Sequence, residues 1–267
     1  MKIAFIGGGN MGEAILAAML SKKLVIAKAI TVSDVIEIRR QYLAQKYAVG
    51  VSANNLLAIE GKEIIVLAIK PQTLPAVMTE LKGHLKPNQL VVSIIAGAGL
   101  NKLTDGLNHQ SVVRSMPNTP AQIGEGVTVW TTTKEVTEQQ KKTAGIILGT
   151  MGKEFYVHDE GWLDMATAVS GSGPAYIFLF IEAMTDAAVK IGLPRDMAKQ
   201  MVMGTLLGAG HLAAQSDKEP AELRRMVTSP GGTTAEAIAT FEKGGFSELM
   251  YQAIKAAYEK SQKLGQG

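Results

Sequence analysis

A cluster of glycines between an apolar run and a helical pattern is the feature that most restricts the fold of this chain. Residues 2–6 read as a short strand, the sequence G-G-G-N-M-G occupies residues 7–12, and a helical composition follows over residues 11–20. In the spacing G-x-G-x-x-G the first glycine makes a tight turn, the second lets the backbone approach a pyrophosphate, and the third allows the helix to pack closely on the strand. The amides and the positive dipole end of the helix N-terminus favour phosphate groups. The pattern therefore predicts a dinucleotide site formed by Gly7, Gly9, Asn10, Met11 and Gly12.

The first half of the chain continues to alternate between strand and helix patterns. Strands are predicted at residues 2–6, 29–33, 63–69, 89–95, 111–115 and 126–131. Helices are predicted at residues 11–20, 36–47, 74–85 and 137–149. Several of the strand runs are apolar throughout, which is typical of strands covered by helices on both faces of a parallel sheet. The order of elements therefore predicts a Rossmann-type, doubly wound parallel sheet.

Beyond about residue 159 the sequence contains helix patterns without strand patterns, at residues 175–191, 195–215, 221–227, 235–243 and 248–264. The sequence S-G-S-G-P at residues 170–174 is interpreted as a glycine hinge between domains, followed by a helix that begins at proline. We therefore predict an α/β fold in which a dinucleotide-binding domain, residues 1–160, precedes an all-α C-terminal domain, residues 161–267.

Composition excludes several classes of function. The chain has 267 residues, a formal net charge of +3 and no cysteine, so neither a basic nucleic-acid surface nor thiolate chemistry is expected. The four histidines lack metal-ligand spacing, and we expect no metal site. No apolar stretch reaches the ~20 residues of a membrane span, and the N-terminus leaves no room for a signal peptide. We therefore expect a cytoplasmic protein without membrane or nucleic-acid partners.

The end of the second predicted strand bears on the choice of dinucleotide. Asp34 could accept hydrogen bonds from a ribose 2′-hydroxyl, which would favour NAD. Ser33, together with Arg39 and Arg40 on the following helix, could instead meet the 2′-phosphate of NADP. The arginine pair could also be an ordinary solvated helix face. The sequence favours NADP and leaves NAD open.

Two further segments stand where strands end, at the edge where doubly wound sheets bind ligands. The first contains Ala68, Lys70 and Pro71, and the second contains Ala96 and Gly97. Their small residues would let a nicotinamide and its ribose lie against the backbone. Ordinary loop packing is the alternative, and Lys70 could be a ligand or only a charge at a strand end.

The sequence S-P-G-G-T-T-A-E, residues 229–236, is the most informative part of the helical half. Thr233 and Glu236 match a capping box, and the preceding Pro-Gly-Gly turn exposes its amides. Amides at a helix N-terminus suit a carboxylate ligand. If Thr233 caps the helix, the hydroxyl of Thr234 can face the ligand. A helix cap without a ligand is the alternative.

These segments together resemble the pyrroline-5-carboxylate reductase family. The resemblance rests on F-I-G-G-G-N-M-G at residues 5–12, A-I-K-P at 68–71, R-S-M-P-N-T-P-A at 114–121, V-S-G-S-G-P-A-Y at 169–176 and V-T-S-P-G-G-T-T at 227–234. They span nearly the whole chain in the family's order and spacing. The resemblance implies an enzyme of proline biosynthesis that reduces the cyclic imine 1-pyrroline-5-carboxylate to L-proline with hydride from NAD(P)H.

The resemblance also implies roles for particular residues. Asn55 would contact the dinucleotide, and Ala96 and Asn118 would lie near the nicotinamide. The substrate carboxylate would be held by Ser229, Gly232 and Thr233, and the hydroxyl of Thr234 would lie near the ring nitrogen, as the catalytic group. Family members are dimers through the helical domain, with each active site completed by the partner chain, and the dimers often form decamers.

Two alternative functions follow from the same features. A β-hydroxyacid dehydrogenase would need a lysine acid/base on the first helix of the second domain, where Lys190 stands only at the far end of the predicted helix. A dinucleotide-sensing interaction protein without turnover would keep the glycine turn at residues 7–12 but would not need residues 229–234.

Overall fold

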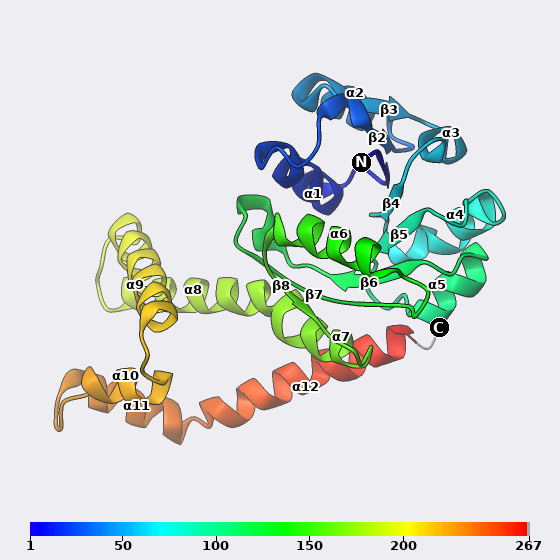
Figure 1. Ribbon diagram of the computed structural model, residues 1–267. Helices are drawn as coiled ribbons and strands as arrows, with labels where there is room; N and C mark the ends of the chain where they lie inside the picture. Colours follow the sequence, from blue (N-terminus) through cyan, green and yellow to red (C-terminus); the bar gives the residue numbers. More distant parts are fainter. Residues whose placement is uncertain (266–267) are drawn as a thin grey trace. The chain divides into compact units, whose positions relative to one another are not determined.

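The computed structural model describes residues 1–265, which include one eight-stranded sheet (Figure 1). The strand order is β3-β2-β1-β4-β5-β6-β7-β8. The strands are β1 Ile3–Ile6, β2 Ile30–Ser33, β3 Gly50–Ser52, β4 Ile64–Leu67, β5 Leu90–Ser93, β6 Val112–Met116, β7 Gly126–Thr132 and β8 Gly152–Tyr156. The doubly wound α/β class predicted from the sequence is confirmed.

The sheet departs from the prediction in β7, which runs antiparallel to β6. Only residues 117–125 connect these two strands, whereas a parallel crossover needs about a dozen residues or more, usually including a helix. The remaining pairs are parallel, including β7 with β8. Two strands were not predicted from the sequence. β3 has only three residues, and β8 contains the charged residues Lys153 and Glu154.

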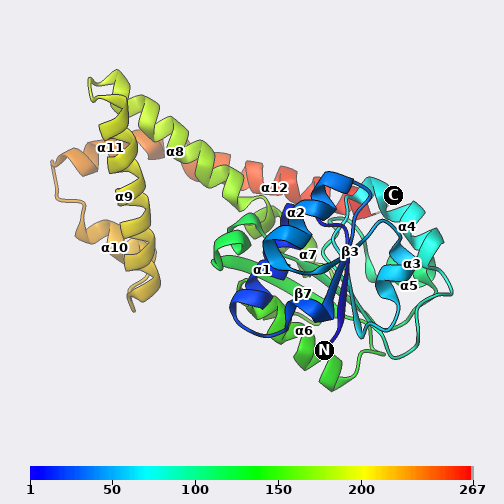
Figure 2. The same cartoon turned by 90° about the horizontal axis from the view of Figure 1, so that it is seen from above.

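Helices cover the sheet on both faces, as Figure 2 shows with the sheet close to edge-on. One face is covered by α1 Asn10–Ser21, α2 Glu37–Tyr47 and α6 Glu138–Gly149. The other is covered by α3 Asn55–Ile59, α4 Leu74–Leu81 and α5 Leu100–Leu107. Along β1, Ile3 and Phe5 enter the first core and Ala4 and Ile6 enter the second. Because both faces are buried, the strand has no polar alternation.

The remaining helices are α7 Trp162–Ala166, α8 Gly173–Lys190, α9 Arg195–Gln215, α10 Pro220–Met226, α11 Thr233–Lys243 and α12 Phe246–Gly265. Short 3₁₀ helices occur at η1 Ala27–Ala29, η2 Pro71–Thr73 and η3 Thr119–Ile123, and a π-helix, η4, at Thr167–Gly171. Within residues 1–265 no helix is both long enough and apolar enough to cross a membrane.

The chain forms two compact units that differ from the sequence-based division at residue 160. The first, called the sheet unit here, is Met1–Pro174 together with the chain from Ala256 onward, and the second, the helical unit, is Ala175–Lys255. The end of α12 belongs to the sheet unit, where Ser261 Oγ donates to Asp164 Oδ1 at 2.8 Å. Residues 170–174, interpreted as a glycine hinge, contain the unit boundary but follow a π-helical and α-helical path.

Candidate functional site

The carboxyl ends of the parallel strands meet at one edge of the sheet unit. Ile6, the last residue of β1, pairs with Ser33 of β2 on one side and Leu67 of β4 on the other. Leu67 pairs in turn with Ser93 of β5. Strand order reverses between β1 and β4. Such a reversal opens the crevice in which doubly wound sheets bind their ligands.

The glycine turn is tightly packed at two of its glycines, Gly7 and Gly12. Gly7 has a φ of +99°, and a Cβ there would lie 2.4 Å from the carbonyl oxygen of Ala68. A Cβ on Gly12 would lie 2.7 Å from the carbonyl oxygen of Gly7. Around Gly9, by contrast, no described atom outside its chain neighbours lies within 4 Å of a built Cβ. Gly9 is also the N-cap of α1, which has no side-chain cap, so the amides of Asn10 and Met11 begin the helix beside an open position.

Ser33 and Asp34 adjoin this turn at the end of β2. The carbonyl oxygen of the buried Ser33 accepts a hydrogen bond from Gly7 N at 2.7 Å. The carboxylate of Asp34 accepts from Gly8 N at 2.8 Å and from Ile36 N at 2.9 Å. Arg40 donates from Nη1 to the carbonyl oxygen of Asp34 at 2.7 Å. The acidic side chain at the expected ribose position is therefore fixed by the backbone.

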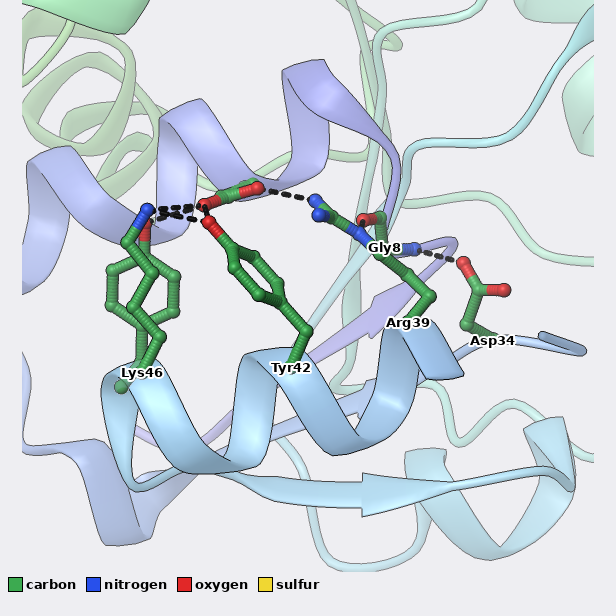
Figure 3. Close-up of polar contacts among 7 residues, drawn as sticks. Gly8, Asp34, Arg39, Tyr42 and Lys46 are labelled. Atoms are coloured by element: carbon green, nitrogen blue, oxygen red, sulfur yellow. Dashed lines mark hydrogen bonds and ion pairs between the residues drawn. The ribbon is translucent and has the colours of Figure 1, made fainter. Parts of the chain in front are cut away.

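A cluster that the sequence analysis missed joins α1 to α2 (Figure 3). Glu13, in the first turn of α1, accepts hydrogen bonds from Arg39, Tyr42, Lys46 and Tyr47. The four donors recur at helical spacing along one face of α2. Burial raises the pKa of Glu13, but the hydrogen bonds outweigh this effect and lower it to about 2. This recurrence, with a carboxylate directly after the glycine turn, was the sequence pattern that could have revealed the cluster.

The next predicted residues lie farther along the same edge. Ala68 N donates to the carbonyl oxygen of Ile6 at 2.8 Å, which places Ala68 at the end of β4. Lys70 is exposed, and Pro71 begins the short helix η2. Asn55 is the first residue of α3, just beyond β3, and its Nδ2 donates to Glu80 Oε2 at 2.7 Å. Ala68, Lys70 and Pro71 therefore follow the carboxyl end of β4, and Asn55 follows that of β3.

Gly97 and Asn118 both make contacts within the protein that hold the backbone around them in place. Gly97 has a φ of +72°, and its Cβ position would lie 3.0 Å from Leu264 Cβ near the end of α12. Asn118 is buried and donates from Nδ2 to the carbonyl oxygen of Ser170 at 3.0 Å. Its Oδ1 accepts from Val127 N at 2.8 Å. The side chain of Asn118 thus links β7 to the π-helix, while Ala96 is half-buried beside Gly97.

A buried charge network below this edge was also missed. Arg114 on β6 donates to Glu160 Oε1 at 2.8 Å and to Asp164 Oδ1 at 3.3 Å. The same oxygen of Glu160 accepts from Leu100 N at 2.8 Å, at the start of α5. Arg114 is the only charged residue of β6, and this was the only indication of the network in the sequence. The network fixes the start of α5 directly after residues 96–99.

The second predicted site lies in the helical unit, at the start of α11. The carbonyl oxygen of Ser229 accepts from Gly232 N at 3.0 Å, and Gly231 has a φ of +69°. These features, with Pro at the second position, describe a type II turn. The predicted capping box is wrong, because Gly232 is the N-cap and Thr233 already lies within the helix, with no side-chain cap. The first amides of α11 are therefore left uncapped by any side chain, and Thr234 is half-buried beside them.

Among residues 1–265, no group of three or more His, Asp or Glu side chains is arranged to hold a metal ion.

Two protein-family models match the chain. Residues 2–97 match the model described as NADP oxidoreductase coenzyme F420-dependent. Residues 160–264 match the model described as pyrroline-5-carboxylate reductase dimerisation. The first match covers the glycine turn, and the second covers the helical unit together with the turn at residues 229–232.

Similar proteins cover nearly the whole chain. A pyrroline-5-carboxylate reductase of Pseudomonas aeruginosa is 42% identical over 99% of this chain and 97% of its own length. One of Synechocystis sp. is 40% identical over 99% and 98%. A solved pyrroline-5-carboxylate reductase structure from Coxiella burnetii has a TM-score of 0.91 at 34% identity and covers 98% of both chains. A Plasmodium falciparum pyrroline carboxylate reductase solved with NADP bound has a TM-score of 0.90 at 31% identity, covering 99% and 98%.

Proposed function

The chain belongs to the pyrroline-5-carboxylate reductase family, and from this premise we propose that it reduces 1-pyrroline-5-carboxylate to L-proline with hydride from NADPH. The observation that carries the proposal is the similarity of 40–42% identity over 99% of the chain to enzymes of that name. NADP is bound in the Plasmodium falciparum relative. These likenesses favour the imine reductase over a β-hydroxyacid dehydrogenase or a dinucleotide sensor.

The sheet unit supplies the proposed dinucleotide site. The open position at Gly9 fits a pyrophosphate approaching the backbone, with the amides of Asn10 and Met11 directed at it. Ser33, Asp34 and Asn55 would line the adenosine side. Residues 68–71 and 96–97, with Asn118, would line the nicotinamide side; Asn118 acts there by fixing the backbone, since both ends of its amide are engaged. When bound, the nicotinamide supplies the hydride.

The turn before α11 supplies the proposed substrate site. Uncapped amides at the start of a helix favour a carboxylate, and those of α11 begin at Thr233. Ser229 and Gly232, in the turn before it, would complete the carboxylate site. The hydroxyl of Thr234 would orient the imine nitrogen and relay a proton. A protonated imine is already a strong electrophile, so precise placement contributes more than a strong side-chain acid, up to ~7–11 kcal/mol in well-oriented systems.

Self-association would complete the enzyme. The match to a dimerisation model supports a dimer formed through the helical unit, which exposes Phe178, Leu179, Met197 and Met201. We extend the proposal to dimers that share active sites and assemble as decamers, as the family resemblance implies. A cytoplasmic location remains a prediction from the sequence.

The proposal is tested by following NADPH oxidation with 1-pyrroline-5-carboxylate. The wild type should turn over the imine, and Thr234→Ala should lower kcat/KM by about 10²-fold, the lower range for loss of a proton-transfer group. Thr240→Ala is the matched control, because Thr240 lies on the same helix and donates only to the carbonyl oxygen of Glu236 at 2.9 Å. Absence of imine turnover in the wild type would refute the function. Full activity of Thr234→Ala would refute the site.

A further inference from the structure

Glu13 accepts hydrogen bonds from four side chains, although it lies on the surface of a helix. Its Oε1 accepts from Tyr47 at 2.7 Å and from Tyr42 and Lys46 at 3.0 Å each, and its Oε2 accepts from Arg39. Lys46 also donates to the hydroxyl of Tyr42 at 2.6 Å. Its pKa of about 2 makes the carboxylate anionic at neutral pH. Arg39, Tyr42 and Lys46 converge on it from one face of α2 (Figure 3).

Arg39 connects this cluster to the glycine turn. Its Nη2 donates to Glu13, and its Nε donates to the carbonyl oxygen of Gly8. The guanidinium also lies 5.0 Å from the centre of the Tyr42 ring, within cation–π range. Within residues 1–265 no hydrogen-bond acceptor engages Nη1 of Arg39. This side of the planar guanidinium can therefore donate to a phosphate, whose geometry matches it.

The backbone of Gly8 is bound by two side chains of opposite charge. Its N–H donates to Asp34 Oδ2 at 2.8 Å, and its carbonyl oxygen accepts from Arg39. A Cβ at Gly8 would lie 2.7 Å from Leu43 Cδ1, so a side chain there would require the buried Leu43 to shift. Asp34 and Arg39, the groups that would distinguish a 2′-hydroxyl from a 2′-phosphate, are thus fixed relative to one another through one residue, Gly8. The position of Arg39 depends on Glu13.

We propose that Glu13 is a positioning residue that sets the preference for NADPH over NADH by holding Arg39 beside the adenosine ribose. Without the carboxylate, Arg39 keeps its charge but loses the partner that fixes its fork. A 2′-phosphate then loses a preorganised ligand, whereas a 2′-hydroxyl, which would bind Asp34, loses little. The inference rests on the proposed function for the identity of the dinucleotide.

The test measures the binding of NADP⁺ and NAD⁺ by isothermal titration calorimetry, without imine. Glu13→Gln should weaken NADP⁺ binding about tenfold, the range for one lost charged hydrogen bond, and NAD⁺ binding less than about twofold. Arg39→Met should produce a similar loss, and the double variant should be no weaker for NADP⁺ than Arg39→Met alone. This non-additivity identifies Glu13 as acting through Arg39.

Two controls test whether Glu13 positions Arg39 or only joins α1 to α2. Glu63→Gln alters a carboxylate bonded to the backbone N of Lys2, before β1, and should leave both affinities unchanged. Tyr47→Phe removes one donor to Glu13 but retains Arg39, and should preserve the ratio of the two affinities. Equal weakening of both nucleotides by Glu13→Gln, or an unchanged ratio, would overturn the proposal.

Folding and function are checked separately. If Glu13→Gln does not fold, as judged by circular dichroism, Arg39→Lys tests the same link, because an ammonium group lacks the fork that spans Gly8 and Glu13. Retention of the NADP⁺ preference by Arg39→Lys would overturn the proposal. Failure of the wild type to reduce the imine would refute the proposed reaction while leaving this binding result intact. Failure to bind either nucleotide would refute both.

Discussion

The sheet unit buries many apolar side chains within its own chain, whereas the helical unit buries few. In the sheet unit, alternate residues of central strands enter two cores, and Phe5, Ile65 and Leu67 are almost fully buried. Within residues 175–255 as described, Ala198 and Val202 are the only hydrophobic side chains that are buried. A unit of that size cannot be stabilised by so small a core.

The helical unit nevertheless carries many large apolar side chains. Phe178 and Leu179 are 57% and 66% exposed, and Met197 and Met201 are about half exposed. Exposed apolar surface on this scale marks a protein-interaction site. The sequence of the sheet unit therefore encodes a core completed by its own chain, whereas that of the helical unit encodes a core completed by self-association.

The units also differ in their ion pairs. In the sheet unit, Arg114 is 8% exposed and contacts Glu160 and Asp164. In the helical unit, Arg195 pairs with Asp186 with both side chains more than half exposed. Removing one partner of a buried pair leaves uncompensated charge, whereas an exposed pair is replaced by water.

The largest expected effect comes from charging the apolar surface of the helical unit. Leu179→Glu should prevent dimer formation and lower activity at least about 100-fold, because each proposed active site needs the partner chain and a buried unpaired charge is costly. Size-exclusion chromatography with light scattering measures the assembly. Ile26→Glu is the matched control, because Ile26 is 72% exposed in the sheet unit, and it should leave both properties unchanged. A dimeric, active Leu179→Glu variant would contradict the comparison.

A smaller effect is expected from the buried ion pairs. Arg114→Met should lower the free energy of unfolding by about 3–5 kcal/mol, because it strands two carboxylates beneath the start of α5. Arg195→Met should change it by about 1 kcal/mol or less. Urea denaturation of both variants at one protein concentration measures the difference. Similar losses for the two variants would show that burial does not separate these pairs.

The sheet unit was largely predictable because its signals are local. The apolar run before Gly7 and the three glycines specify a strand, a turn and a helix within a few residues, and the positive φ of Gly7 needs no side chain from elsewhere to explain it. The same logic located Ser33, Ala68 and Ala96 at the ends of strands. Antiparallel β7 could not be read in this way, because strand direction follows from the length of a connection rather than from the strand's own residues.

Contacts between distant parts of the sequence were not predictable. The sequence predicts Gly97 as a glycine that lines the cofactor site, but no local pattern indicates that Leu264 of the last helix packs against it. Arg114 meets Asp164 of α7 across 50 residues of sequence, and Asp164 also accepts a hydrogen bond from Ser261 where α12 returns to the sheet unit. At Thr233 a local rule failed, because the Pro-Gly-Gly turn places Gly232 at the N-cap position, one residue earlier than the capping box requires. The turn geometry outweighed the side-chain preference.

The smallest expected effect is a pH dependence confined to the sheet unit. The pKa of Glu13 is lowered from 4.5 to about 2 in the folded chain, so its contribution to stability is fully present above pH 4.5 and is lost as the pH falls towards 2. The wild type should therefore have a higher Tm than Glu13→Gln at pH 6, and the gap should narrow as the pH falls from 4.5 to about 2. Glu222→Gln is the control from the helical unit, since Glu222 forms an exposed pair with Lys218 at 2.7 Å. Its Tm difference from the wild type should stay within about 1 °C across this range.

A Tm difference for Glu13→Gln that does not depend on pH would mean that the hydrogen bonds of the cluster, and not the charge of Glu13, join α1 to α2. The charge would then also be dispensable for holding Arg39.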